Sequence, residues 1–192
     1  MCELTALQQK FSCGCGEMDL RFWEPLAKHT SFRIGGGAEI MAFPKTPEEL
    51  SQLLKLSNLS DCKPAILGAG TNVLAPDEGM NGLVICLKDC LNGMQQLDET
   101  HLQVMAGVTM ARAAVFAAGL GLGGMEFAHG IPGTVGGGVY MNAGAYGGEL
   151  GQIVDQVEIM DDSGNIHCLS REEMHFSYRH SRLEEESAIV LS

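Results

Sequence analysis

A cluster of basic and hydroxyl side chains lies near the end of the 192-residue sequence, at Tyr178-Arg179-His180-Ser181-Arg182. The chain has only 12 lysines and arginines, so two arginines within five residues stand out. A guanidinium group donates two parallel hydrogen bonds to a carboxylate and stays charged. The cluster is therefore either a binding site for an anionic group or a solvated strip of surface charge.

A second source of anion binding is the main chain of residues 130–149, GIPGTVGGGVYMNAGAYGGE. Eight of these residues are glycine. Because glycine loses more backbone entropy on ordering than any other residue, the stretch predicts a loop rather than a helix or strand. Main-chain N–H groups in such a loop can face an anion. The stretch has no serine and is largely apolar, unlike a flexible linker. We interpret it as an ordered wrapping around a large, partly apolar anion or as tight turns between strands.

A shorter glycine turn, residues 68–72, follows an expected strand at residues 65–67. It is not a dinucleotide fingerprint, because Val73 occupies the position of the third glycine. No Lys-Ser/Thr pair follows, which excludes a P-loop. Thr71 and Asn72 beside main-chain N–H groups suit a pyrophosphate, and the alternative is a plain strand-to-loop turn. Arg33 precedes the first expected strand and is either an anion contact or a surface charge.

Four segments in this order resemble the UDP-N-acetylenolpyruvoylglucosamine reductases, the MurB family of peptidoglycan synthesis. They read TSFRIGG from residue 30, LGAGTNVL from 67, MEFAHGIPGTVGGGVYMNAGAYGGE from 125 and FSYRHSR from 176. The resemblance covers residues 29–192. It implies an α+β fold, a two-lobed FAD-binding module of the vanillyl-alcohol-oxidase (PCMH) type. In the family, a separate C-terminal domain covers the substrate.

The expected organisation is an N-terminal segment at residues 1–28, a first FAD-binding lobe at 29–88 and a second at 89–192. Residues 189–191 form an apolar strand at the very end of the chain, where domains usually have frayed, polar residues. We therefore expect the natural protein to continue past Ser192 into the missing substrate domain.

The resemblance implies a flavoprotein oxidoreductase with FAD as cofactor and NADPH as hydride donor. The reaction converts UDP-N-acetylglucosamine enolpyruvate to UDP-N-acetylmuramate, a nucleotide-sugar step of cell-wall synthesis that supports cell shape and division. Arg179 matches the catalytic arginine of the family, and Tyr178 is the neighbouring substrate-binding residue. The family's catalytic serine and glutamate lie in the C-terminal domain, and Ser181 does not match that serine. We therefore expect this chain to bind FAD without turning over alone.

The resemblance assigns the cofactor site to residues of the four segments. The expected FAD-binding residues are Arg33, Gly35, Leu67, Gly68, Ala69, Gly70, Thr71, Asn72, Val73, Leu74, Gly130, Ile131, Pro132, Gly133, Thr134, Gly136, Gly137, Asn142, Ala143 and Gly144. Residues 67–74 would cradle the diphosphate, and the second group would line the rest of the cofactor. His129 departs from the smaller or apolar residue expected at its position, which puts only local packing in doubt.

Two other functions stay open at this point. Another oxidoreductase of the same flavoprotein superfamily would be favoured by a covalent flavin, for which His129 is the only histidine near the glycine-rich stretch. The second open function is a non-catalytic module, which either binds flavin or has glycine loops that are only structural. Failure of a folded sample to bind flavin would favour structural loops.

The composition limits the partners. The net charge of −12 argues against nucleic acid or an acidic membrane surface. Seven irregularly spaced cysteines without a signal peptide indicate reduced thiols in the cytoplasm, and Cys13-Gly-Cys15 is too closely spaced for a zinc knuckle. No metal and no obligate protein partner are expected.

The elements that position these residues alternate short strands with helices. We expect strands at residues 38–43, 65–67, 83–87, 101–106, 153–160, 166–169 and 189–191. Helices are expected from Thr46 to about residue 58, by a capping box with Glu49, and from Thr109 to residue 118, with Gly119 as the C′ glycine. A second capping box, Ser170 to Glu173, predicts a short helix. The hairpin at residues 161–164 favours α+β over a doubly wound sheet.

Overall fold

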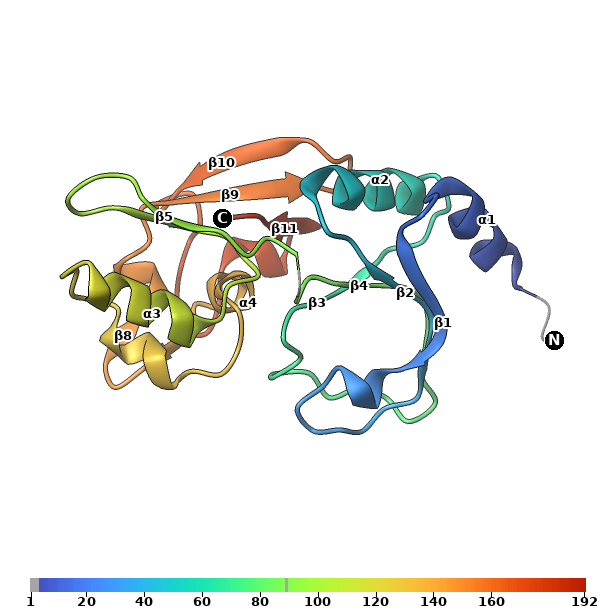
Figure 1. Ribbon diagram of the computed structural model, residues 1–192, viewed down its shortest axis with the longest axis horizontal. Helices are drawn as coiled ribbons and strands as arrows, with labels where there is room; N and C mark the ends of the chain where they lie inside the picture. Colours follow the sequence, from blue (N-terminus) through green and yellow to red (C-terminus); the bar gives the residue numbers. More distant parts are fainter. Residues whose placement is uncertain (1–3, 89) are drawn as a thin grey trace. The chain divides into compact units, whose positions relative to one another are not determined.

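The computed structural model describes residues 4–88 and 90–192, which form two compact units. Unit 1 comprises Met1–Cys90 and Asp162–Gly164, and unit 2 comprises Leu91–Asp161 and Asn165–Ser192. Each unit combines helices with strands (Figure 1), as the expected α+β class requires. Within the described residues, every helix is too short or too polar to cross a bilayer.

Unit 1 is built on a four-stranded mixed sheet in the order β1-β2-β4-β3. Strand β1 pairs antiparallel with β2, whereas β2 and β3 each run parallel to β4. Its elements are α1 (Ala6–Gly14), β1 (Asp19–Pro25), the 3-10 turn η1 (Leu26–Lys28), β2 (Gly37–Phe43), α2 (Pro47–Asn58), β3 (Ala65–Leu67) and β4 (Met80–Cys86). Met41, Leu67 and Val84 from three of these strands meet in a buried apolar cluster that also contains Leu26 and Ala75.

Helix α2 begins as predicted, with one change in its cap. The side chain of Thr46 accepts a hydrogen bond from the Glu49 amide at 3.2 Å, and Pro47 is the first helical residue. The Glu49 carboxylate bonds the amide of Lys45 at 2.6 Å rather than that of Thr46. The N-cap is therefore the predicted one, and only the reciprocal bond of Glu49 is displaced by one residue.

Unit 2 contains a three-stranded antiparallel sheet in the order β10-β9-β11 and two short hairpins, β5-β6 and β7-β8. The pairing of β9 with β10 confirms the predicted hairpin. Its elements are β5 (Met94–Gln96), β6 (Leu102–Val104), α3 (Met110–Gly119), η2 (Glu126–Gly130), α4 (Val135–Tyr140), β7 (Gly144–Ala145), β8 (Gly148–Glu149), η3 (Leu150–Gln152), β9 (Gln156–Asp161), β10 (Ile166–Ser170), η4 (Arg182–Glu184) and β11 (Ala188–Val190).

Helix α3 ends one residue later than the sequence predicted, and its C′ glycine lies two residues later. Gly119 is its last helical residue, and Gly121, with φ 77°, is the left-handed C′ residue. The amide of Leu122 bonds the carbonyl of Ala117, and the amide of Gly121 bonds that of Ala118, both at 3.0 Å. This is the Schellman pattern. The expectation that Gly119 is the C′ glycine is therefore wrong, because the left-handed turn needs Gly121.

Alanine at these two glycines should have opposite effects on the free energy of unfolding. An added Cβ meets no atom within 4 Å at either position. Gly119→Ala should raise the free energy of unfolding by roughly 0.5–1 kcal/mol, because alanine loses less backbone entropy in a helix. Gly121→Ala should lower it by about 1–2 kcal/mol, because φ is positive there. Urea denaturation of both variants would check this, and equal changes in their free energies of unfolding would contradict the assigned cap.

The predicted loop at residues 130–149 is wrong in part, because it contains helix α4 and the strands of the β7-β8 hairpin. Close packing explains the glycines of α4. A Cβ on Gly136 would lie 2.8 Å from the Cβ of Ala106, and one on Gly138 would lie 2.9 Å from Cδ1 of Leu150. Thr134 caps the helix by accepting from the amide of Gly137 at 3.4 Å. Glycine thus lets this helix approach its neighbours, an advantage that helix propensity does not register.

The predicted helix after Ser170 is limited to a single turn. Its reciprocal cap forms, since the Ser170 amide bonds the Glu173 carboxylate at 2.8 Å and the Glu173 amide bonds the Ser170 hydroxyl at 3.3 Å. The chain then reaches His175, whose φ of 48° is left-handed. A left-handed residue ends helical propagation, so the cap is present without the helix.

Candidate functional site

The glycine turn of unit 1 is held against the segment that carries Arg33. The Ser31 amide bonds the carbonyl of Gly70 at 2.9 Å, and the Gly36 amide bonds the carbonyl of Pro76 at 2.9 Å. Gly70 has φ 64°, and a Cβ there would lie 2.0 Å from the carbonyl oxygen of His29. Only glycine therefore fits this position. The structure brings residues 29–36 and 68–76, which contain predicted cofactor-binding residues, into direct contact.

The surface of this pair of segments carries both charge and apolar area. Arg33 is exposed with φ 56°, and within the described residues it has no carboxylate partner. Gly35, with φ 117°, lies where a Cβ would come within 2.4 Å of Ala75. Val73 and Leu74 are 37% and 72% exposed. A cation and exposed apolar side chains beside a glycine turn suit a ligand that combines an anionic group with a flat apolar one.

In unit 2, Arg179 lies on a tight turn beside the glycine-rich segment. Ser177 and His180 exchange main-chain hydrogen bonds across the turn, at 3.1 and 3.2 Å. Arg179 between them has φ 55°, and its Nη2 donates to the carbonyl oxygen of Gly144 at 2.8 Å. Its Cζ lies 5.7 Å from the centre of the Tyr178 ring, which is itself 85% exposed. The two predicted substrate-binding residues thus lie together at the surface.

The two arginines of this cluster differ in charge balance. Arg182 forms an ion pair with Glu186 at 2.5 Å and donates to the carbonyl of Glu173 at 3.2 Å. Arg179 makes no ion pair within the described part of the chain, and its only hydrogen bond there goes to a neutral carbonyl. Within the described part of the chain, no carboxylate therefore balances the charge of Arg179, a difference from Arg182 that the sequence alone could not decide. Its left-handed backbone is of the kind that strained functional residues adopt.

The segment around Asn142 fixes this turn. Asn142 is buried, its Nδ2 donates to the carbonyl of Ser177 at 2.8 Å and its Oδ1 accepts from the amide of Gly151 at 2.8 Å. Buried Ser181 donates from its hydroxyl to the carbonyl of Tyr140 at 2.6 Å. Both side chains therefore hold residues 177–181 against residues 140–144. The side-chain amide of Asn142 and the hydroxyl of Ser181 are thus engaged within unit 2.

A family model described as an FAD binding domain matches residues 38–170. The chain belongs to this family of FAD-binding domains. A "UDP-N-acetylenolpyruvoylglucosamine reductase" of Lactobacillus acidophilus is 42% identical over 175 residues, which are 91% of this chain and 58% of that protein. A reductase of the same name from Clostridioides difficile is 42% identical over 91% of this chain and 57% of its own length.

Solved structures agree with this assignment to the FAD-binding domains. The crystal structure titled MurB from Thermus caldophilus superimposes with a TM-score of 0.70 at 32% identity, covering 91% of this chain and 60% of that one. These matches confirm the MurB resemblance. Physcomitrella patens BBE-like 1 reaches 0.69 at 12% identity, covering 97% of this chain and 43% of that one, which supports the fold alone. The chain therefore spans little more than half the length of its MurB relatives.

The residues of this FAD-binding domain fit the cofactor of the family. A Cβ on Gly130 would meet no atom within 4 Å, and Gly137 is exposed, so main chain is accessible at these two residues. Arg33 in unit 1 supplies a positive charge without a carboxylate partner among the described residues. The guanidinium group of Arg33 and the glycine turn at residues 68–72, both in unit 1, match the needs of a diphosphate. FAD is accordingly the cofactor that this domain is built to hold.

Some of the predicted cofactor-binding residues are placed less favourably for direct contact with a ligand. Ala143 and Thr134 are buried, and the hydroxyl of Thr134 caps α4. His129 is exposed in η2. Sequence reasoning missed the pairing of Glu24 with His29 beside the glycine turn, because their spacing matches no motif.

Proposed function

We propose that the chain is the FAD-binding part of a reductase that converts UDP-N-acetylglucosamine enolpyruvate to UDP-N-acetylmuramate with NADPH as hydride donor. The observation that carries the proposal is Arg179, a surface cation without a carboxylate partner among the described residues, held on the Gly144 carbonyl at 2.8 Å. Because the chain spans 58% of the length of the Lactobacillus relative, the activity is proposed for the natural gene product that contains it.

In this proposal, residues 67–74 with Arg33 and Gly35 hold the diphosphate of FAD. Residues 130–137 and 142–144 line the rest of the cofactor. Bound FAD supplies the hydride for reduction of the enolpyruvyl double bond. Residues of the glycine turn contribute main-chain donors, and Arg33 contributes a charge that neutralises phosphate oxygens.

Arg179 acts on the substrate. Hydride addition to the enolpyruvyl double bond creates enolate-like negative charge next to the substrate carboxylate. A fixed guanidinium beside that charge stabilises the transition state more than the ground state. The hydrogen bond from Nη2 to Gly144 orients the group before substrate arrives. Tyr178, with its ring 5.7 Å from the Arg179 Cζ, supports the guanidinium by a cation–π contact.

NADPH oxidation by the natural gene product tests this proposal. We expect consumption of NADPH that depends on UDP-N-acetylglucosamine enolpyruvate and yields UDP-N-acetylmuramate. UDP-N-acetylglucosamine, which lacks the enolpyruvyl group, is the matched control and should not be reduced. Oxidation of small alcohols with no response to the enolpyruvyl substrate would favour another enzyme of the superfamily and contradict the proposal.

A further inference from the structure

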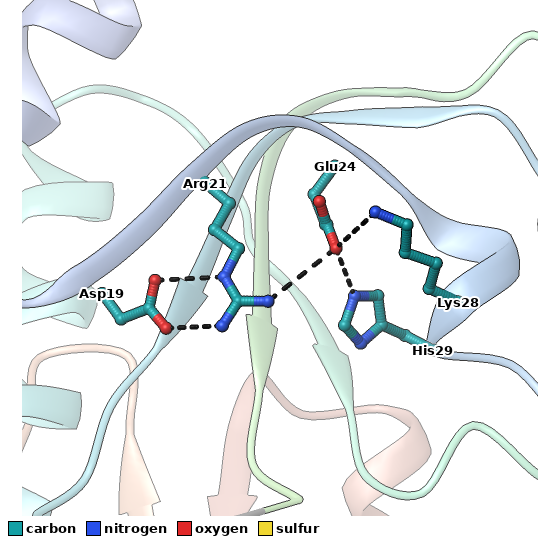
Figure 2. A network of polar contacts seen from close by, with 5 residues as sticks. All are labelled: Asp19, Arg21, Glu24, Lys28 and His29. Carbon is teal, nitrogen blue, oxygen red and sulfur yellow. Dashed lines mark hydrogen bonds and ion pairs between the residues drawn. The ribbon is translucent and has the colours of Figure 1, made fainter.

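A polar network in unit 1 centres on the carboxylate of Glu24, at the end of β1 (Figure 2). Oε1 of Glu24 lies 3.0 Å from Nε2 of His29, 3.5 Å from Nζ of Lys28 and 3.8 Å from Nη1 of Arg21. Asp19 pairs with the far side of Arg21 at 2.7 Å. The hydrogen bond from His29, followed by the charge of Lys28, lowers the pKa of the Glu24 carboxyl. An ionised carboxylate only accepts hydrogen bonds, so Nε2 of His29 is the donor.

Two strands anchor the ring of His29. Besides its bond to Glu24 of β1, the ring stacks at a tilt on Phe43 of β2, with the centroids 5.5 Å apart. The side chains of Glu24 and His29 are only 14% and 15% exposed. In this shielded position the pair is less screened than an ion pair at the surface, so it holds the ring in one place.

The main chain of His29 forms the wall of the glycine turn. Its carbonyl oxygen lies where it would be 2.0 Å from a Cβ on Gly70. Two residues on, the Ser31 amide bonds the carbonyl of Gly70 at 2.9 Å. Buried Thr30 closes the same segment by donating to the carbonyl of Ile34 at 3.2 Å, across Arg33. A shift of His29 would therefore move both the glycine turn and the segment that carries Arg33.

We infer that Glu24 and His29 are positioning residues for the diphosphate-binding turn, acting through the main chain of residues 29–31. The inference rests on the proposed role of residues 67–74 in holding the diphosphate. Neither side chain needs to touch FAD. The pair fixes the segment of residues 29–31 to β1 and β2, and this segment contacts the glycine turn at Gly70.

Two substitutions at His29 separate hydrogen bonding from ring packing. Glutamine can place an amide nitrogen near the position of Nε2, whereas the shorter asparagine cannot, and both lose the ring on Phe43. We expect His29→Asn to raise the Kd for FAD by about tenfold, the factor for one lost hydrogen bond to a charged group. His29→Gln should stay within about threefold of the unaltered chain. Asp19→Asn, in the same network but remote from the turn, is a further control.

Riboflavin, which has no phosphate, distinguishes positioning of the turn from general loss of structure. Its Kd should change by less than about twofold in both His29 variants. Hydrogen exchange at the Ser31 amide gives a readout without any flavin, and it should speed up in His29→Asn but not in His29→Gln. Equal FAD affinity of the two variants, or parallel losses for FAD and riboflavin, would overturn the inference. If the unaltered chain bound no FAD, the proposed function would fail, and the exchange data would decide the role of His29.

Discussion

Replacing Arg179 with alanine in the natural gene product should slow turnover of the enolpyruvyl substrate by about 10²–10³-fold. This is the effect of removing one preorganised donor that faces developing charge, about 2.7–4 kcal/mol of transition-state stabilisation. The bleaching of flavin absorbance by NADPH should keep its rate, because Arg179 is assigned to the substrate. Stopped-flow absorbance would measure the bleaching and then its reversal by the enolpyruvyl substrate.

Arg182→Ala is the matched control, since it removes a guanidinium three residues away that is paired with Glu186. Reversal of bleaching in that variant should stay within about threefold of the unaltered protein, because its charge is already neutralised. Arg179→Gly adds a second check, because glycine relieves the left-handed backbone at φ 55°. The glycine variant should be at least as stable as the alanine variant and equally slow. If both half-reactions slowed equally in Arg179→Ala, the assigned role would be wrong.

Gly70→Ala should disable cofactor binding. Its Cβ would lie 2.0 Å from the His29 carbonyl oxygen, and the contact atom is backbone, so the turn or the facing segment must move. The left-handed φ of 64° adds about 1–2 kcal/mol of strain. We expect the Kd for FAD to rise by more than about tenfold and the free energy of unfolding to fall by about 2 kcal/mol or more. Titration of FAD with isothermal calorimetry and urea denaturation would measure the two effects.

Gly16→Ala separates backbone strain from the clash. Gly16 also has a left-handed φ, 58°, but a Cβ there meets no atom within 4 Å. This variant should lose about 1–2 kcal/mol of stability while its Kd for FAD stays within about twofold. Equal FAD affinity in Gly70→Ala and Gly16→Ala would remove the glycine turn from the cofactor site.

Much of the fold was predictable where local signals and burial agree. Helix α2 combines a threonine cap, a proline at its first position and an apolar face, so its start was found. Strand β1 was missed because alternating charges at Asp19, Arg21 and Glu24 hide its pairing with β2. Helix α4 was missed because its glycines disfavour a helix locally, whereas close packing against Ala106 and Leu150 requires them. Such tertiary requirements override propensity and leave no local trace.

The sequence predicted which segments form the candidate site better than it predicted what each side chain does there. The motifs brought out Arg179, but only the ion pair of Arg182 with Glu186 separates the two arginines of the cluster. Asn142 was expected to bind cofactor, whereas both ends of its side chain hold Ser177 and Gly151. Sequence spacing identifies residues near a site, and hydrogen-bond partners that are distant in sequence decide what each one does.

Absorption spectroscopy of the purified 192-residue chain, after FAD is added and the excess removed, tests the central claim most directly. We predict a retained flavin band, which is lost or strongly reduced in Gly70→Ala. Circular dichroism of the same samples shows whether the chain is folded. A folded chain that retains no flavin would contradict the assignment of the two glycine-rich segments as its cofactor site.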